Sequence, residues 1–422
     1  MIKYRYLAAA VAAAVALGTS GTAAAVSFQS NQWQLDVNGN VNGFLDYNSC
    51  DNSTTSVEGG LVCNTGPNGH NKAAIESGLL PSAMVFKVST TQDGINIAGT
   101  VGFYPGLNTS ITGKRGIGRG AINVRQNFLT FGTPQWGTVK VGRDLGLFQA
   151  HAILNDMTLL GVGSGAAFLG GNTTLGRIGI GYVYADWIPQ ISYTSPKING
   201  FQFACGVFQP FEQFAFSGND NSATMSNINQ PGYQLQGTYS WKGPIKGQVW
   251  ADFMWQRNQA NATDSSTTGG KLPNGAQINA DAFDVGGKAS VAMGGGTLAG
   301  VASYYKGYGI GTTAIGFDGV SFANGVLEKR DSDGWYVQAT YKIGKPKIGI
   351  SYGESTLDLA SNETAATNPD LVYKNSSAVA GLYYGLTPAL NLVLEYTHTR
   401  AENQAGGTTQ DNSVATGAIF FF

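Results

Sequence analysis

Alternation of apolar and polar side chains at every second residue is the feature that most restricts how this chain can fold. Between Trp33 and Tyr47 the odd positions are apolar, aromatic or glycine, whereas the even positions are mostly Asn, Asp and Gln. Successive side chains of a β-strand point to opposite faces, so this segment predicts a strand with an apolar medium on one side and water on the other. The pattern returns clearly at 245–255 and 390–399 and less regularly at 297–307.

Sixteen segments of this kind follow one another along the chain. We delimit them as 33–47, 82–90, 95–104, 121–131, 136–142, 187–194, 201–210, 232–241, 245–257, 281–293, 296–307, 333–342, 346–357, 375–385, 390–399 and 412–422. The connections alternate in length. Short connections, such as the tight turns 91–94 and 132–135, alternate with long polar loops such as 48–81 and 143–186. This order places the tight turns at one end of an antiparallel sheet and the long loops at the other.

The first 25 residues predict a secretory signal. Lys3 and Arg5 give a positively charged start, residues 8–17 form an apolar stretch, and residues 23–25 are alanines suited to cleavage. The alternative is an uncleaved anchor, for which the apolar stretch is too short to span a bilayer as a helix. We therefore expect a signal peptide at 1–25 and a single mature domain at 26–422.

Beyond this signal, no run of about 20 apolar residues offers a transmembrane helix. Charged residues make up only 12% of the chain, against roughly 25% in a typical soluble domain. In lipid every backbone N–H and C=O must be paired within the protein, so a sheet can span a membrane only if it closes on itself. We expect an all-β fold, a transmembrane antiparallel β-barrel of about 16 strands in the cell outer membrane, with short periplasmic turns and long extracellular loops.

The cysteines and the C-terminus give two local predictions. Cys50 and Cys63 lie in one polar loop of a chain expected to be exported, where disulfides persist, so they predict a bridge, with two free thiols as the alternative. Cys205 has apolar neighbours in a predicted strand and is expected to be inert, buried or facing lipid. The chain ends on Phe422 after two further phenylalanines. This ending resembles the signature that the outer-membrane assembly machinery reads, although a terminal strand of a soluble β-protein could look similar.

Three stretches, VKVGRDLGLF (139–148), ISYTSPKINGFQF (191–203) and the terminal FFF, together resemble the Gram-negative general porin family in their order and spacing. The resemblance implies a homotrimer of sixteen-stranded barrels in contact with outer-membrane lipid and lipopolysaccharide. It implies passive diffusion of ions and small hydrophilic solutes through a water-filled channel. It also implies that the third loop, here 143–186, folds into the lumen and narrows it. The Pro-Glu-Phe-Gly tip that is frequent in this loop of the family is absent.

The resemblance further implies a constriction in which loop carboxylates face basic residues of the wall. Arg143, at the start of the loop, best matches the family pattern, and Lys87 and Arg125 fall on the polar faces of their strands. We expect Asp144 and Asp156 to be the opposing acids. Opposed charges in a narrow water column would set ion preference. The alternative is that these five residues are simply solvated charges of the lumen and loops.

Other function classes find less support in the sequence. A membrane-embedded hydrolase needs a nucleophile with a histidine base, but His398, near a strand end, has no matching serine, and we expect no enzymatic activity. A net charge of −1 argues against nucleic-acid binding. Nothing predicts a cofactor or a metal site. A substrate-selective channel stays open, with Phe44 and Trp250 on polar faces as a hint of an aromatic ladder, and so does a surface adhesin.

Overall fold

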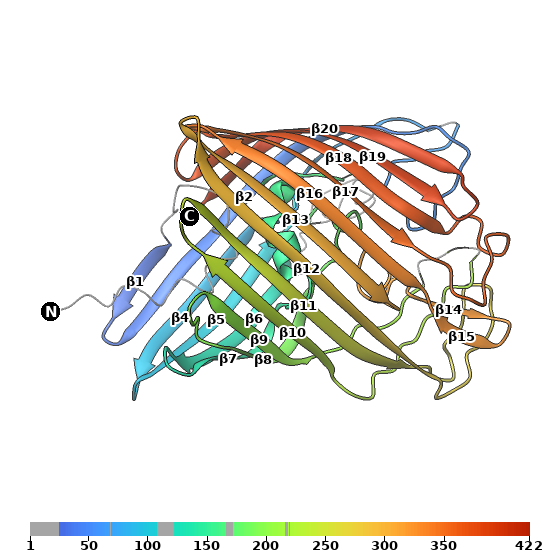
Figure 1. Cartoon of the computed structure of the whole chain (residues 1–422), viewed down its shortest axis with the longest axis horizontal. Coiled ribbons are helices and arrows are strands. Elements are labelled where there is room, and N and C mark those ends of the chain that lie inside the picture. The colour runs from blue at the N-terminus through green and yellow to red at the C-terminus, as the bar shows by residue number, and fades with distance from the viewer. Residues whose placement is uncertain (1–24, 68, 108–121, 166–171, 216–217, 219) are drawn as a thin grey trace.

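Sixteen long antiparallel strands close into a barrel in the computed structural model, which describes residues 25–67, 69–107, 122–165, 172–215, 218 and 220–422 (Figure 1). The strands are β2 (Trp33–Ser49), β4 (Ala83–Gln92), β5 (Ile95–Pro105), β6 (Ile122–Thr133), β7 (Gly137–Leu145), β8 (Trp187–Thr194), β9 (Phe201–Phe208), β10 (Gly232–Trp241), β11 (Ile245–Gln259), β12 (Gln277–Met293), β13 (Gly296–Tyr308), β16 (Asp331–Lys342), β17 (Pro346–Leu357), β18 (Val372–Gly385), β19 (Leu390–Asn403) and β20 (Thr408–Phe421). Each predicted segment coincides with one of them, so the expected all-β barrel is confirmed. Residues 1–24 of the predicted signal lie outside the described part.

The barrel closes where the last strand meets the first long one. β20 pairs with the C-terminal part of β2, from Asn40 opposite Phe421 to Ser49 opposite Asn412. On its other side, β2 pairs with β4. Two five-residue strands also pair with β2. β1 (Val26–Ser30) pairs with the start of β2, and β3 (Lys72–Glu76) pairs with its end. Closure removes the sheet edges, so the ladder pairs the backbone groups of the wall within the protein.

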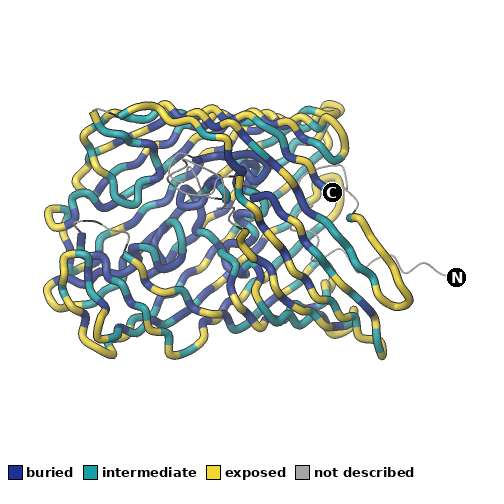
Figure 2. Tube along the Cα trace, turned by 180° about the vertical axis from the view of Figure 1, so that it is seen from behind, coloured by how far each residue is buried: buried dark blue, intermediate teal, exposed yellow. Residues whose placement is uncertain are grey.

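The barrel is inverted relative to a soluble protein, with apolar side chains outside and polar ones inside. In β19, Leu392, Leu394 and Tyr396 are exposed, whereas Glu395 and Thr397 are 1% exposed. Buried and exposed positions alternate in this way along the strands around the wall (Figure 2). Such a wall suits lipid on its outer face and a polar interior. Within the described residues, no helix is long and apolar enough to cross a membrane.

The two ends of the barrel differ as the connections predict, with two corrections. Tight turns such as 134–136 and 242–244 lie at one end, and most connections at the other are long. Residues 404–407 are an exception, because β19 and β20 extend beyond the predicted segments and meet in a short turn at the long-loop end. The long connection predicted at 143–186 begins only after Leu145, since β7 includes Arg143 and Asp144.

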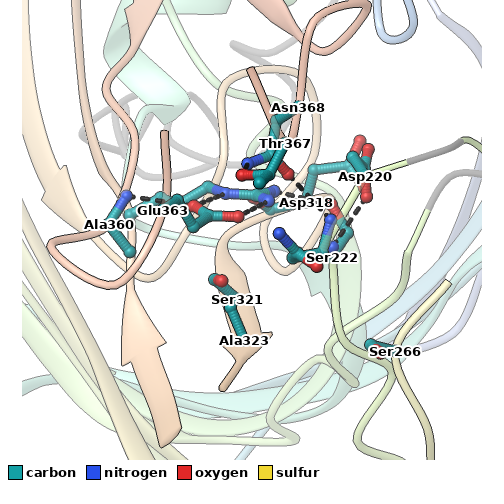
Figure 3. Close-up of polar contacts among 12 residues, drawn as sticks. Asp220, Ser222, Ser266, Asp318, Ser321, Ala323, Ala360, Glu363, Thr367 and Asn368 are labelled. Atoms are coloured by element: carbon teal, nitrogen blue, oxygen red, sulfur yellow. Dashed lines mark hydrogen bonds and ion pairs between the residues drawn. The ribbon is translucent and has the colours of Figure 1, made fainter. Parts of the chain in front are cut away.

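The loops at the long end pack against one another. One of them contains the hairpin β14 (Val320–Ala323) and β15 (Val326–Lys329), and it shares an apolar cluster with the loops around Met225 and Leu272. A fourth loop, residues 358–371, joins this region through a salt bridge between Arg330 and Glu363, whose side chains are both 0% exposed. Figure 3 shows Glu363 beside Ala360, with Ser222 and Asp318 close by. These loops therefore form a packed layer with its own small core.

Candidate pore constriction

The described parts of the connection after β7, residues 146–165 and 172–186, fold into the barrel. They carry a short helix, α1 (Ala150–Asn155), and a 3₁₀ turn, η2 (Met157–Leu160), which lie inside the wall in Figure 1. Their apolar side chains pack with Leu79, Tyr182 and Tyr336 in a cluster within the lumen. The inward course of this loop agrees with the expectation, whereas its helix was not predicted.

Inward-facing polar side chains of the wall hold the backbone of this loop. Gln234 accepts hydrogen bonds from the N–H groups of Leu147 (2.7 Å) and Phe148 (3.0 Å). Glu395 accepts from those of Val162 (2.7 Å) and Gly163 (2.9 Å). Further contacts of the same kind join the wall to the loop, from Gln149 N–H to Asp284, from Met157 N–H to Gln338, from Gln338 to Asn155 C=O and from Tyr336 to Ala152 C=O. An irregular backbone can lie at this depth only if its polar groups are satisfied, and these side chains supply the partners.

Asp156 belongs to this anchoring and does not line the cavity described below. Its carboxylate accepts hydrogen bonds from Thr158 N–H (3.0 Å), from the Thr158 hydroxyl (2.6 Å) and from the Tyr182 hydroxyl (2.8 Å), and the residue is 4% exposed. Nearby, the fully buried Arg177 donates to the backbone oxygen and the hydroxyl of Ser377 on β18. Both charged groups fix the shape of the loop.

A partly open cavity of about 260 Å³ separates the inward loop from the wall formed by β4–β8. Three predicted residues, Lys87, Arg125 and Arg143, line it. Asp186, the last residue of the loop, is the one carboxylate among the described lining residues. At neutral pH the cavity therefore has two more positive than negative side chains when Asp186 is ionised.

Arg125 is held in place, whereas the other two cations are not. Its guanidinium donates to Asn172 Oδ1 (2.8 Å), lies 3.5 Å from the Tyr184 hydroxyl and sits 5.4 Å from the centre of the Tyr104 ring. Burial raises the pKa of Tyr184 to about 12, so this hydroxyl stays neutral beside the arginine. The side chains of Lys87 and Arg143 make no hydrogen bond or ion pair with residues in the described part of the chain.

Asp144 lies on the wall and not in the loop. Its residue is 6% exposed on β7 and forms an ion pair with Lys140, four residues earlier on the same strand. It also accepts a hydrogen bond from Gln126 Nε2 (3.0 Å). Lys140 thus compensates its charge locally, and the carboxylate does not line the cavity.

Asp186 lines the same cavity as Arg125 and Arg143. Burial raises the pKa of its carboxyl, and the N–H of Trp187 and the charges of Arg143 and Arg125 partly oppose this rise. Its backbone has a φ of 53°, a left-handed conformation that ends the loop immediately before β8. Tyr104, Tyr184 and Trp187 also line the cavity and were not predicted.

The remaining predicted residues lie away from the cavity. Cys50 and Cys63 are joined by a disulfide in the first long loop, and Cys205 is a free, partly buried cysteine. The C-terminal Phe422 exchanges backbone hydrogen bonds with Gly39 on β2 (2.9 and 3.1 Å). Within the described residues, no group of three or more His, Cys, Asp or Glu side chains is placed to hold a metal ion.

Comparisons with known proteins give one family and several structures of the same fold. The family model for Gram-negative porins matches residues 8–404. The structure is similar to the outer membrane channel DcaP of Acinetobacter baumannii, with a TM-score of 0.65 at 16% identity over 94% of this chain and 99% of that one.

Two further solved structures share the fold. The anion-selective porin from Comamonas acidovorans has a TM-score of 0.57 at 14% identity over 92% of this chain and 100% of that one. The trimer form of in-vitro folded OmpT from Vibrio cholerae has a TM-score of 0.51 at 14% identity over 93% of this chain and 100% of that one. No curated protein sequence matches the chain.

Proposed function

The chain belongs to the family of Gram-negative porins, and on that premise we propose that the cavity between the inward loop and strands β4–β8 is the constriction of its channel. The protein is an outer-membrane β-barrel that allows passive diffusion of ions and small hydrophilic solutes. Lys87, Arg125 and Arg143 are its basic side and Asp186 its acidic side. The observation that carries this proposal is that three cations from three strands line one cavity beside the inward loop.

We propose that this constriction favours anions. Its side chains carry an excess of positive charge, and neither Lys87 nor Arg143 is paired with a carboxylate of the described residues. Unpaired charges in a narrow channel attract counter-ions and repel ions of their own sign. The overall charge of −1 does not bear on this preference, because distant surface charges are screened within about 10 Å at 0.1 M salt.

The proposal also covers the oligomeric state, the processing and the assembly of the mature protein. A homotrimer is supported by the trimer form of a protein with the same fold. Residues 1–25 act as a cleaved signal, so that β1 begins directly after the cleavage point. Phe422, paired with β2 at the closure of the barrel, is the residue that the assembly machinery reads. The outer face of the wall contacts lipid and lipopolysaccharide, and no catalytic role is proposed.

The test is the reversal potential of the refolded mature protein in a planar bilayer with a KCl gradient. The wild type is expected to prefer chloride, and Lys87→Gln/Arg143→Gln is expected to lose most of that preference. Lys242→Gln, which changes an exposed lysine in the tight turn after β10, is the matched control and should behave as the wild type. A double variant that keeps the wild-type reversal potential would remove both residues from the constriction.

A further inference from the structure

The constriction has an apolar side that a channel for hydrophilic solutes does not need. Aliphatic side chains from the inward loop, from the segment before β4 and from the end of β7 line the same cavity as the cations: Leu79, Leu145, Leu154, Leu159, Leu175 and Ile178. Several of them are only partly buried, including Leu154 and Leu175. The cavity therefore presents a charged wall and an apolar wall to the same solute.

We propose that the cavity binds organic anions in which one carboxylate is joined to an apolar body, of which benzoate is a simple example. This inference rests on the proposed function, because it assigns the solute class of the same constriction. The carboxylate would meet Arg125 and Lys87, and the apolar body would lie against the leucines of the inward loop. Such solutes would pass through a saturable site in addition to diffusing freely.

The geometry supports a preformed carboxylate site. Asn172, Tyr184 and the Tyr104 ring fix the guanidinium of Arg125. Such a fixed, planar donor suits a carboxylate. Lys87 lines the same cavity and forms no salt bridge with a carboxylate of the described residues. A flexible lysine beside a fixed arginine can approach anions of different shapes.

Neither a small anion nor a neutral ring alone can interact favourably with both the charged wall and the apolar wall of the cavity. A small inorganic anion gains from the cations but loses hydration against the leucines, since burying charge beside apolar groups is unfavourable. A neutral ring gains from the leucines but leaves the cations without a counter-charge. The volume of about 260 Å³ is just below the range of roughly 300–1,000 Å³ that holds drug-sized ligands, so a single ring is a suitable size.

The experiment measures block of single-channel KCl current by benzoate, acetate and benzyl alcohol, which separate the charge from the ring. Benzoate is expected to block saturably at a concentration at least tenfold below the other two. Equal block by benzoate and acetate, or by benzoate and benzyl alcohol, would overturn the proposal even if the reversal potential shows an anion preference. Absence of anion preference, with benzoate block retained, would instead contradict the proposed ion selectivity.

Variants of the apolar wall test whether benzoate binds within this cavity. Leu154→Asn is expected to weaken benzoate block at least fivefold, and Leu175→Asn provides a second substitution in the same wall. Leu386→Asn, at an exposed leucine in the tight turn before β19, is the matched control and should keep wild-type block. If both cavity variants bind benzoate as tightly as the control does, the apolar wall is not part of the site and the proposal fails.

Discussion

The packed layer of extracellular loops should depend on the buried ion pair between Arg330 and Glu363. Arg330 donates from Nε to Glu363 Oε2 (2.9 Å) and from Nη2 to Oε1 (2.6 Å), and its Nη1 donates to Ser222 Oγ (2.6 Å) and Asp318 O (3.0 Å). Burial alone would raise the pKa of Glu363, but the hydrogen bond and charge of Arg330 lower it below the ordinary value, so the pair stays ionised. One guanidinium thus joins three loops.

Arg330→Met should therefore open these loops, because it leaves a buried carboxylate without its partner at a cost of about 3–5 kcal/mol. If the loops open locally, amide protection should fall roughly a hundred- to a few thousand-fold. Hydrogen exchange followed by mass spectrometry can read this at the inter-loop bonds from Ala223 N–H to Val320 C=O and from Phe322 N–H to Asn221 C=O.

The control for this prediction is the double variant Arg330→Met/Glu363→Leu. It removes both charges and should recover much of the protection, since replacing a buried pair by apolar residues is often nearly neutral. Wild-type protection in the single variant would refute the reasoning, because the loops would then be held without the pair. If the double variant loses as much amide protection as the single variant does, the loss comes from the changed shape of the side chains and not from an unpaired charge.

Three further predictions concern the channel and its first loop. Because the pKa of Asp186 is raised, its carboxyl is protonated at a higher pH than an ordinary aspartate, so acidification should increase anion preference, and Asp186→Asn should abolish this change in reversal potential. Glu395→Ala removes the acceptor of two loop N–H groups, at about 1–3 kcal/mol each, and should raise open-channel current noise, whereas quiet traces would contradict the anchoring role. Replacing Cys50 and Cys63 by serine should destabilise the loop by about 3 kcal/mol and speed its proteolysis without altering conductance.

The barrel could be predicted from sequence because the membrane imposes one rule on every strand. Where lipid lies on one side and polar interior on the other, side chains must alternate, and the predicted segments coincide with strands there. The prediction fails at the long-loop end, where β19 continues to Asn403 and β20 begins at Thr408. Those ends project beyond the region where one face needs to be apolar, so their sequence, including Arg400 and Glu402, does not alternate as lipid would require.

Some residues of the candidate site could be placed from the sequence, and others could not. Lys87 and Arg125 could be assigned to the cavity because strand parity fixes which face a residue occupies. Asp156 could not be placed, since its direction depends on Tyr182 and on how the inward loop folds. Asp144 could not be placed because its compensation by Lys140 depends on β7 extending three residues further than predicted, to Leu145.

The polar lining of the barrel makes different contacts in two sectors of the wall. Inward side chains of β10, β12, β16 and β19, such as Gln234, Gln338 and Glu395, are engaged in hydrogen bonds to the loop backbone. On β4 and β7, Lys87 and Arg143 line the cavity without a hydrogen bond or ion pair to the described residues, whereas Arg125 on β6 is buried and held by Asn172 and Tyr184. We propose that ions pass between the loop and this second sector, where Lys87 and Arg143 set the ion preference.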